Sequence, residues 1–71
     1  MVILNGTEFT YHPGMSLKEL LDIYNREKSM SLAFDGFVVL VNGKALSESD
    51  ALGRILLDND KIQITPLLSG G

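Results

Sequence analysis

The hydrophobic and polar positions at the start of the chain fall into two short runs that a turn separates. Residues 1–4 are apolar, Asn5 and Gly6 interrupt them, and residues 7–11 then alternate between polar and apolar side chains. An Asn-Gly pair between two such runs favours a type I′ turn, because both central positions of that turn need a positive φ. The pattern therefore predicts an N-terminal β-hairpin that ends before Pro13.

A helical period follows the hairpin. Ser16 lies three positions before Glu19, which is the spacing of a capping box at the start of a helix. Apolar side chains then recur at the spacing of one helical face, at Leu17, Leu20, Leu21 and Tyr24. We expect an amphipathic helix that begins after Ser16 and frays near Lys28, followed by a loop through residues 30–36.

Two more strands and a short helix are predicted in the second half of the chain. Residues 37–41 are all apolar, and an Asn-Gly pair at 42–43 predicts a tight turn into a short return strand at 44–46. Residues 47–57 open with acidic side chains and then carry scattered apolar ones, which favours a turn or two of helix.

The last predicted strand covers residues 61–65, which alternate between polar and apolar side chains. A tight turn at 58–60 precedes it, where Asn59 tolerates the left-handed conformation. Pro66 is expected to end the strand, because proline has no N–H to donate to a neighbouring strand.

The order of these elements predicts an α+β fold. One helix must cover one face of the sheet, and the first and last strands are both apolar enough to occupy its middle, side by side and parallel. This arrangement is a β-grasp, the ubiquitin-like roll, with a mixed sheet of four to five strands and one main helix packed on one face. We expect residues 1–66 to form the domain and residues 67–71 to form a flexible C-terminal Gly-Gly tail.

Composition excludes several classes of function. The 71 residues contain no Cys and one His, which excludes disulfides and makes a structural zinc site implausible. Six basic side chains are scattered among nine acidic ones, for a net charge of −3, so nucleic acid is not an expected partner. The longest apolar run, at 37–41, is far below the roughly 20 residues that span a bilayer, so no membrane contact is expected. We expect a soluble, cytoplasmic protein.

Polar candidates for catalysis are weak. His12 precedes a proline and has no acidic partner at ligand spacing, so we interpret it as a turn histidine. Asp58 and Asp60 are interpreted as a solvated turn. Gly36 and Gly43 have the wrong spacing for a phosphate-binding loop. The chain offers no nucleophile–base pair, and we therefore expect that it is not an enzyme by itself and binds no cofactor.

The end of the chain has a different character. Residues 62–71 carry no charged side chain and finish with Leu67, Leu68, Ser69, Gly70 and Gly71. Because glycine lacks Cβ, such an end can thread through a narrow channel and present its carboxylate to the active site of another protein. Ser69 and Gly70 would thread, while Leu67 and Leu68 would dock on an apolar groove. A frayed terminus, the alternative, explains neither the missing charge nor the two leucines.

These features together resemble the ThiS/MoaD family of ubiquitin-like sulfur carriers. The resemblance covers essentially the whole chain and rests on the predicted topology, on residues 41–44, on the turn at 58–62 and on Pro66 with the final Gly-Gly. Asn59 stands where family members commonly have glycine. The length and the compact hairpin are more similar to ThiS, whereas Leu-Ser before Gly-Gly is similar to some small subunits of molybdopterin synthase.

The resemblance implies a chemical role for the tail. Gly71 would be adenylated by an E1-like enzyme of the ThiF/MoeB type, which consumes ATP. It would then receive sulfur as a thiocarboxylate from a donor such as a cysteine desulfurase. A thiazole synthase of the ThiG type would accept that sulfur for thiamine biosynthesis. The alternatives are delivery to the large subunit of molybdopterin synthase, a ubiquitin-like modifier joined to lysines, and a binding module without tail chemistry.

One strand also offers a surface for partners. Residues 37–41 are apolar on both faces, whereas the helix can cover only one face of the sheet. We assign Phe37, Val39 and Val41 to the core, and we expect Val38 and Leu40 to form an apolar patch that docks partners.

Overall fold

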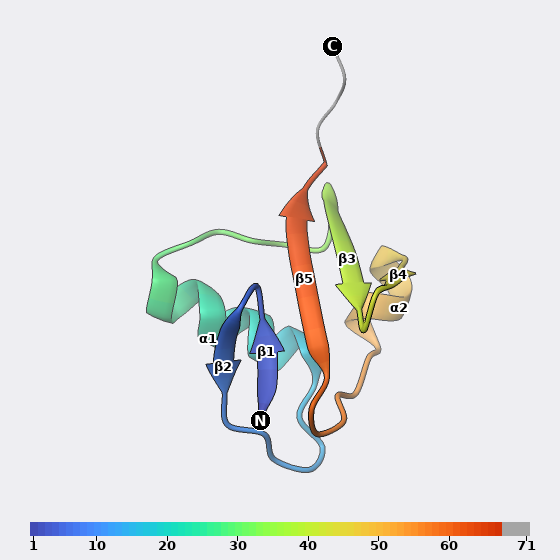
Figure 1. Ribbon diagram of the computed structural model, residues 1–71. Coiled ribbons are helices and arrows are strands. Elements are labelled where there is room, and N and C mark those ends of the chain that lie inside the picture. The colour runs from blue at the N-terminus through green and yellow to red at the C-terminus, as the bar shows by residue number, and fades with distance from the viewer. Residues whose placement is uncertain (68–71) are drawn as a thin grey trace.

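The protein is a five-stranded mixed sheet with one main helix. The computed structural model describes residues 1–67, which form, in order, β1 (Val2–Leu4), β2 (Thr7–Phe9), α1 (Leu17–Lys28), β3 (Phe37–Val41), β4 (Lys44–Leu46), α2 (Glu48–Leu52) and β5 (Lys61–Pro66). The strands lie in the order β2-β1-β5-β3-β4 (Figure 1). β1 and β5 pair in parallel, and the other neighbours pair antiparallel. The predicted β-grasp fold, with the last strand beside the first, is confirmed.

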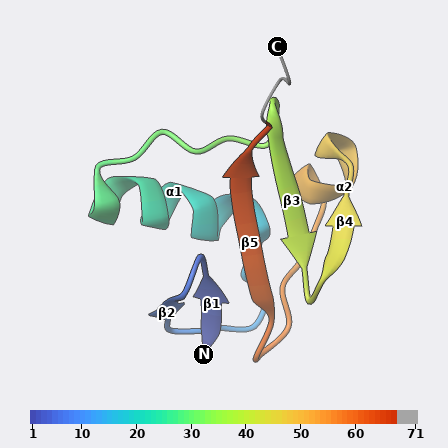
Figure 2. The same cartoon turned by 45° about the horizontal axis from the view of Figure 1, so that its top comes forward.

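α1 lies across one face of this sheet (Figure 2). It begins as the sequence predicts, because the Ser16 hydroxyl accepts a hydrogen bond from the Glu19 amide at 3.0 Å. It ends at Lys28, and Ser29 caps it in the left-handed conformation, with φ of 53°. All four residues of the predicted apolar stripe are buried, namely Leu17, Leu20, Leu21 and Tyr24. Burying a side chain of this size contributes roughly 1.5–3 kcal/mol to folding, so this stripe is what holds the helix to the sheet.

The core fills the space between α1 and the sheet. Val39 and Val41 of β3 face it together with Ile62 and Ile64 of β5, and all four are buried. Phe37 packs against this core from its edge and is half-buried. Met15 and Leu56 close one end of the core, and the Leu56 amide donates to the Met15 carbonyl at 2.8 Å. The assignment of Val39 and Val41 to the core is confirmed.

Both hairpins use the predicted Asn-Gly turns. Asn5 and Gly6 have φ of 50° and 82°, and Asn42 and Gly43 have φ of 53° and 83°. These are the positive values that a type I′ turn requires at both central positions. Asn59 has φ of 72°, which explains why a glycine suits this position and why asparagine can replace it.

The two turn asparagines also bind β5 through their side chains. Asn5 donates to the Ile64 carbonyl at 3.0 Å and accepts from the Ile64 amide at 2.8 Å. Asn42 accepts from the Lys61 amide at 2.9 Å. The carboxamide of Asn5 therefore continues the hydrogen bonding of β1 to β5 where the backbone of β1 turns away.

Two boundaries differ from the expectation. β2 ends at Phe9, earlier than the alternating pattern indicates. β5 includes Pro66, which lies opposite Phe37, and the Leu67 amide still donates to the Gly36 carbonyl at 3.0 Å. Because that bond connects the residues flanking the Phe37–Pro66 pair, the pair is of the kind that exchanges no N–H bonds, and the missing N–H of Pro66 costs nothing.

The interpretation of Asp60 as part of a solvated turn is wrong. Its side chain is 5% exposed, and its carboxylate accepts from the Asn42 side chain at 2.9 Å and from the Leu57 amide at 2.8 Å. The Arg54 guanidinium lies 3.6 Å away. Asp58 is 57% exposed, as expected, and pairs with the N-terminal amine at 2.7 Å. Buried and hydrogen-bonded on both oxygens, Asp60 is a structural residue that fixes the turn before β5.

We predict that Asn5→Gly destabilises the protein through the lost carboxamide. Glycine keeps the positive φ but removes two hydrogen bonds to β5, and it adds entropy to the unfolded chain. Asn59→Gly is the matched control, since its hydrogen bond to the Met1 carbonyl uses the backbone amide, which glycine retains. In urea unfolding we expect Asn5→Gly to lose about 1–3 kcal/mol more than Asn59→Gly. Equal losses would contradict a role for the side chain.

Candidate functional site

The chain leaves the folded body at the end of β5. The Leu67 amide donates a hydrogen bond to the Gly36 carbonyl beside the start of β3, and the Leu67 side chain is 61% exposed. This exit is at the opposite end of the molecule from Met1 (Figure 1). The predicted tail residues Leu68, Ser69, Gly70 and Gly71 lie outside the described residues. The geometry therefore fixes where the tail begins, next to β3 at the end of the central strand.

The face of the sheet opposite α1 is open. Strand alternation turns Val38 and Leu40 of β3 away from the core, and both are half-buried. Their partners across the strands are Thr65 for Val38, and Gln63 and Ala45 for Leu40. Directly paired side chains lie on the same side of a sheet, so these residues form one surface. We call Val38, Leu40, Ala45, Gln63 and Thr65 the outer sheet face.

The outer sheet face leads to the exit of the tail. Leu67 follows Thr65 by two positions and remains hydrogen-bonded to the β3 side of the sheet, so the alternation places it on the same side as Gln63 and Thr65. The sequence predicted Leu67, Val38 and Leu40 as separate candidates, and the structure brings them to one side of two paired strands. The polar members Gln63 and Thr65 were missed, although the pairing of β3 with β5 would have indicated them.

Lys61 lies beside Gln63 on the same side of β5, whereas the histidine lies elsewhere. His12 Nε2 is 2.6 Å from the Glu19 carboxylate, seven residues further on, a contact that the sequence spacing did not indicate. The hydrogen bond to Glu19, with a smaller effect of the Pro13 carbonyl, raises the pKa of His12 above its ordinary value. Both side chains are about half exposed, and the pair joins the loop before α1 to the first turn of the helix.

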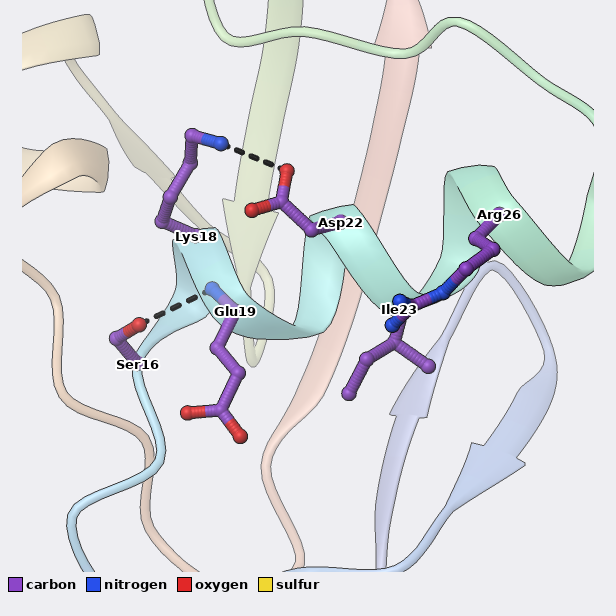
Figure 3. A pocket seen from close by; sticks show the side chains of 6 residues that line it. All are labelled: Ser16, Lys18, Glu19, Asp22, Ile23 and Arg26. Carbon is purple, nitrogen blue, oxygen red and sulfur yellow. Dashed lines mark hydrogen bonds and ion pairs between the residues drawn. The ribbon is translucent and has the colours of Figure 1, made fainter.

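A shallow hollow runs along the solvent side of α1 (Figure 3). In this hollow Lys18 Nζ lies 2.6 Å from Asp22, and the Ser16 hydroxyl accepts a hydrogen bond from the Glu19 amide. Ile23 and Arg26 complete its lining. No nucleophile sits beside a base here, so the hollow offers no catalytic arrangement.

The described residues carry no other obvious chemical centre. Within residues 1–67, no three metal-ligating side chains gather closely enough to hold an ion. The helices in this part of the chain are too short or too polar to cross a membrane. What distinguishes the molecule is therefore a small body with an open sheet face and an uncharged C-terminal segment.

Comparison with known protein families identifies the family to which a chain with these features belongs. The model of the ThiS family matches residues 2–71. The chain belongs to the ThiS family. A search of the curated proteins found no significant match. Members of the ThiS family are ubiquitin-like sulfur carriers rather than catalysts, and they act together with E1-like adenylating enzymes and sulfur-transfer partners. The predicted resemblance is confirmed over nearly the whole length.

We predict that Glu19→Gln lowers the pKa of His12. The carboxylate stabilises the imidazolium, so its removal returns the pKa toward the ordinary value of about 6.5. Titration of the His12 ring signals by proton NMR measures this pKa directly. Glu27→Gln, in the last turns of the same helix, is the control and should leave the His12 titration unchanged.

The same pair makes the stability of this ThiS-family chain depend on pH. Because folding raises the pKa of His12, the stabilisation is complete below the pKa of the unfolded chain and is lost as pH rises through the folded pKa. His12→Gln should therefore lower the melting temperature at pH 5.5 and leave it nearly unchanged at pH 9. An equal decrease at both pH values would show that the imidazolium is not what stabilises the fold.

Proposed function

We propose that this ThiS-family chain carries sulfur as a thiocarboxylate on Gly71 and donates it for thiazole formation in thiamine biosynthesis. The observation that carries the proposal is the family match, which extends through the Gly-Gly end to residue 71. The described body supports it, since residues 1–67 present no nucleophile–base pair or metal site of their own. Chemistry is then expected from the tail together with the active sites of partner enzymes.

The reaction begins with activation of a poor electrophile. A carboxylate oxygen of Gly71 would attack the α-phosphate of ATP in the active site of an E1-like adenylating enzyme of the ThiF/MoeB type, releasing pyrophosphate. Hydrosulfide, or a persulfide from a donor such as a cysteine desulfurase, would then attack the acyl carbon and release AMP. With a persulfide, a thiol must afterwards reduce the acyl disulfide to free the thiocarboxylate. ATP is consumed by the partner, and the carrier itself binds no cofactor.

The narrow end of the chain suits this chemistry. Gly70 and Gly71 lack Cβ, and Ser69 is small, so the three residues together can enter a channel that excludes larger side chains. Leu67 is exposed at the start of this segment, and it would dock with Leu68 against an apolar surface of the partner. The acceptor that follows is an enzyme of the thiazole synthase (ThiG) type.

The outer sheet face is the proposed docking surface for the adenylating enzyme. Val38 and Leu40 give it an apolar centre, and Gln63 and Thr65 border that centre with polar groups. Interfaces commonly have such an apolar core with a polar rim. Since β5 connects this face to the tail, contact with the face would limit how far Gly71 can lie from the partner's active site.

Intact mass spectrometry tests the carrier role. The full chain is co-expressed with the adenylating enzyme of its own source, and we expect a mass gain equal to exchange of one oxygen for sulfur. Deletion of Gly71 is the control and should abolish the gain, because the reacting carboxylate would then belong to another residue. An unmodified mass with ATP and a competent sulfur donor present would contradict the proposal and favour a binding module.

A double substitution tests the docking face. Val38→Ser with Leu40→Ser should weaken binding of the adenylating enzyme by roughly tenfold or more, since central apolar contacts dominate most interfaces. Isothermal titration calorimetry measures this affinity, and circular dichroism checks that the domain still folds. Met30→Ser changes an exposed apolar side chain outside this face and should leave binding unchanged. Undiminished affinity in the folded double variant would contradict the assignment of Val38 and Leu40 to the docking surface, and loss of the fold would place both residues in the core.

A further inference from the structure

A second concave surface lies on the helical side of the sheet. It is bounded by α1, by the segment that joins α1 to β3 and by α2, and it has a volume of about 230 Å³. We call it the interhelix groove. It is on the opposite side of the sheet from the outer sheet face, so the contacts proposed above for the adenylating enzyme leave it open.

The wall of the interhelix groove is held in place by a pair of hydrogen bonds. The Asn25 side chain donates to the Leu32 carbonyl at 2.8 Å and accepts from the Leu32 amide at 2.9 Å. Phe34, two residues further on, is 6% exposed and anchors the same segment in the core. The groove is therefore formed before any partner arrives, which lowers the entropy lost on binding.

The floor of the interhelix groove is apolar. Leu21 and Phe34 are buried beneath it, and Leu32 is half-buried in its wall. Leu52 of α2 is 55% exposed at its other side. An exposed leucine beside buried ones offers a place where an apolar side chain from another molecule can remove further surface from water.

The rim of the groove is acidic. Three carboxylates line it, at Asp22, Asp35 and Glu48, against one ammonium group at Lys18. Lys18 is already paired with Asp22 at 2.6 Å. Within residues 1–67, Asp35 and Glu48 take part in no ion pair. The rim thus keeps an excess of two negative charges around an apolar floor.

We propose that the interhelix groove docks a partner segment in which apolar side chains are flanked by Lys or Arg. Apolar side chains would fill the floor beside Leu52, and the cations would pair with Asp35 and Glu48. Such charge complementarity selects partners and speeds their association. This inference goes beyond the sulfur chemistry proposed above, because it requires neither Gly71 nor a thiocarboxylate.

Two other occupants have the wrong charge. The C-terminal segment of this chain, residues 62–71, contains no cationic side chain that could pair with the rim. A second copy of the chain would bring the same acidic rim and a net charge of −3. Like charges oppose association with a second copy, and the C-terminal segment can form no ion pair with the rim through its side chains, so both occupants are less favourable than a basic partner segment.

A peptide titration of the full chain tests the proposal. The probe is a synthetic peptide in which Leu-Phe is flanked on each side by two arginines. Its binding is measured by two-dimensional NMR of the isotope-labelled protein. We expect saturable shifts at the amides of Leu21, Leu32 and Leu52, and weaker binding as the salt concentration rises. Two control peptides replace the arginines with glutamates or Leu-Phe with Ser-Ser, and both should bind more weakly.

Matched variants identify the groups responsible. Asp35→Asn with Glu48→Gln should weaken binding of the arginine peptide by roughly three- to tenfold, while Glu8→Gln on β2 should have no effect. Because neither the peptide nor the readout involves Gly71, failure here leaves the sulfur-carrier proposal intact. Failure of thiocarboxylate formation would likewise leave this result intact.

Four outcomes would overturn the proposal. Binding of the glutamate peptide as tight as that of the arginine peptide would overturn it, as would shifts that map to Val38 and Leu40. Groove signals of the free protein that change on deletion of residues 68–71 would identify the chain's own tail as the occupant. Groove signals that change with protein concentration would identify a second copy.

Discussion

The position of β5 depends on hydrogen bonds from both sides. β1 binds it in parallel and β3 binds it antiparallel, and the carboxamides of Asn5 and Asn42 add bonds where the backbones of those strands turn away. Asn42 also contacts the buried carboxylate of Asp60, immediately before β5 begins. A parallel neighbour alone offers few bonds over strands this short, so the two asparagines complete the support of the central strand.

This support has a consequence for the tail. If the terminal segment followed an edge strand, the end of that strand could lose its pairing with the sheet, as termini commonly do. Here Ile62 and Ile64 are buried in the centre of the core, and the hydrogen bonding of β5 continues to the Leu67 amide. The described body therefore fixes the point from which the tail begins. Under the proposed function, a carrier that must place one carbon atom in the active site of a partner would gain accuracy from such a fixed origin.

Short-range patterns predicted most of the fold, and long-range contacts account for what they missed. The two Asn-Gly turns, the Ser16 cap and the apolar stripe of α1 are set by residues within four positions of one another. The burial of Asp60 depends on Asn42, eighteen positions away, and no local pattern indicates that contact. The pairing of Val38 and Leu40 with β5 likewise follows from strand order. The sequence could indicate these two side chains as candidates for a docking patch, but it could not show that Gln63 and Thr65 lie beside them.

The distribution of charge separates the two surfaces of the body. The outer sheet face is built from apolar and neutral polar side chains, with Lys61 beside it on the same side of β5, and it leads to a C-terminal segment without charged side chains. The groove on the helical side, by contrast, has an acidic rim. Transfer of a group between enzymes requires that a carrier leave one partner and bind the next. Binding free energy that comes mainly from apolar contact on one face and from charge on the other responds differently to partner composition and to salt. Under the two proposals above, a body of this size would distinguish partners while one tail serves the chemistry.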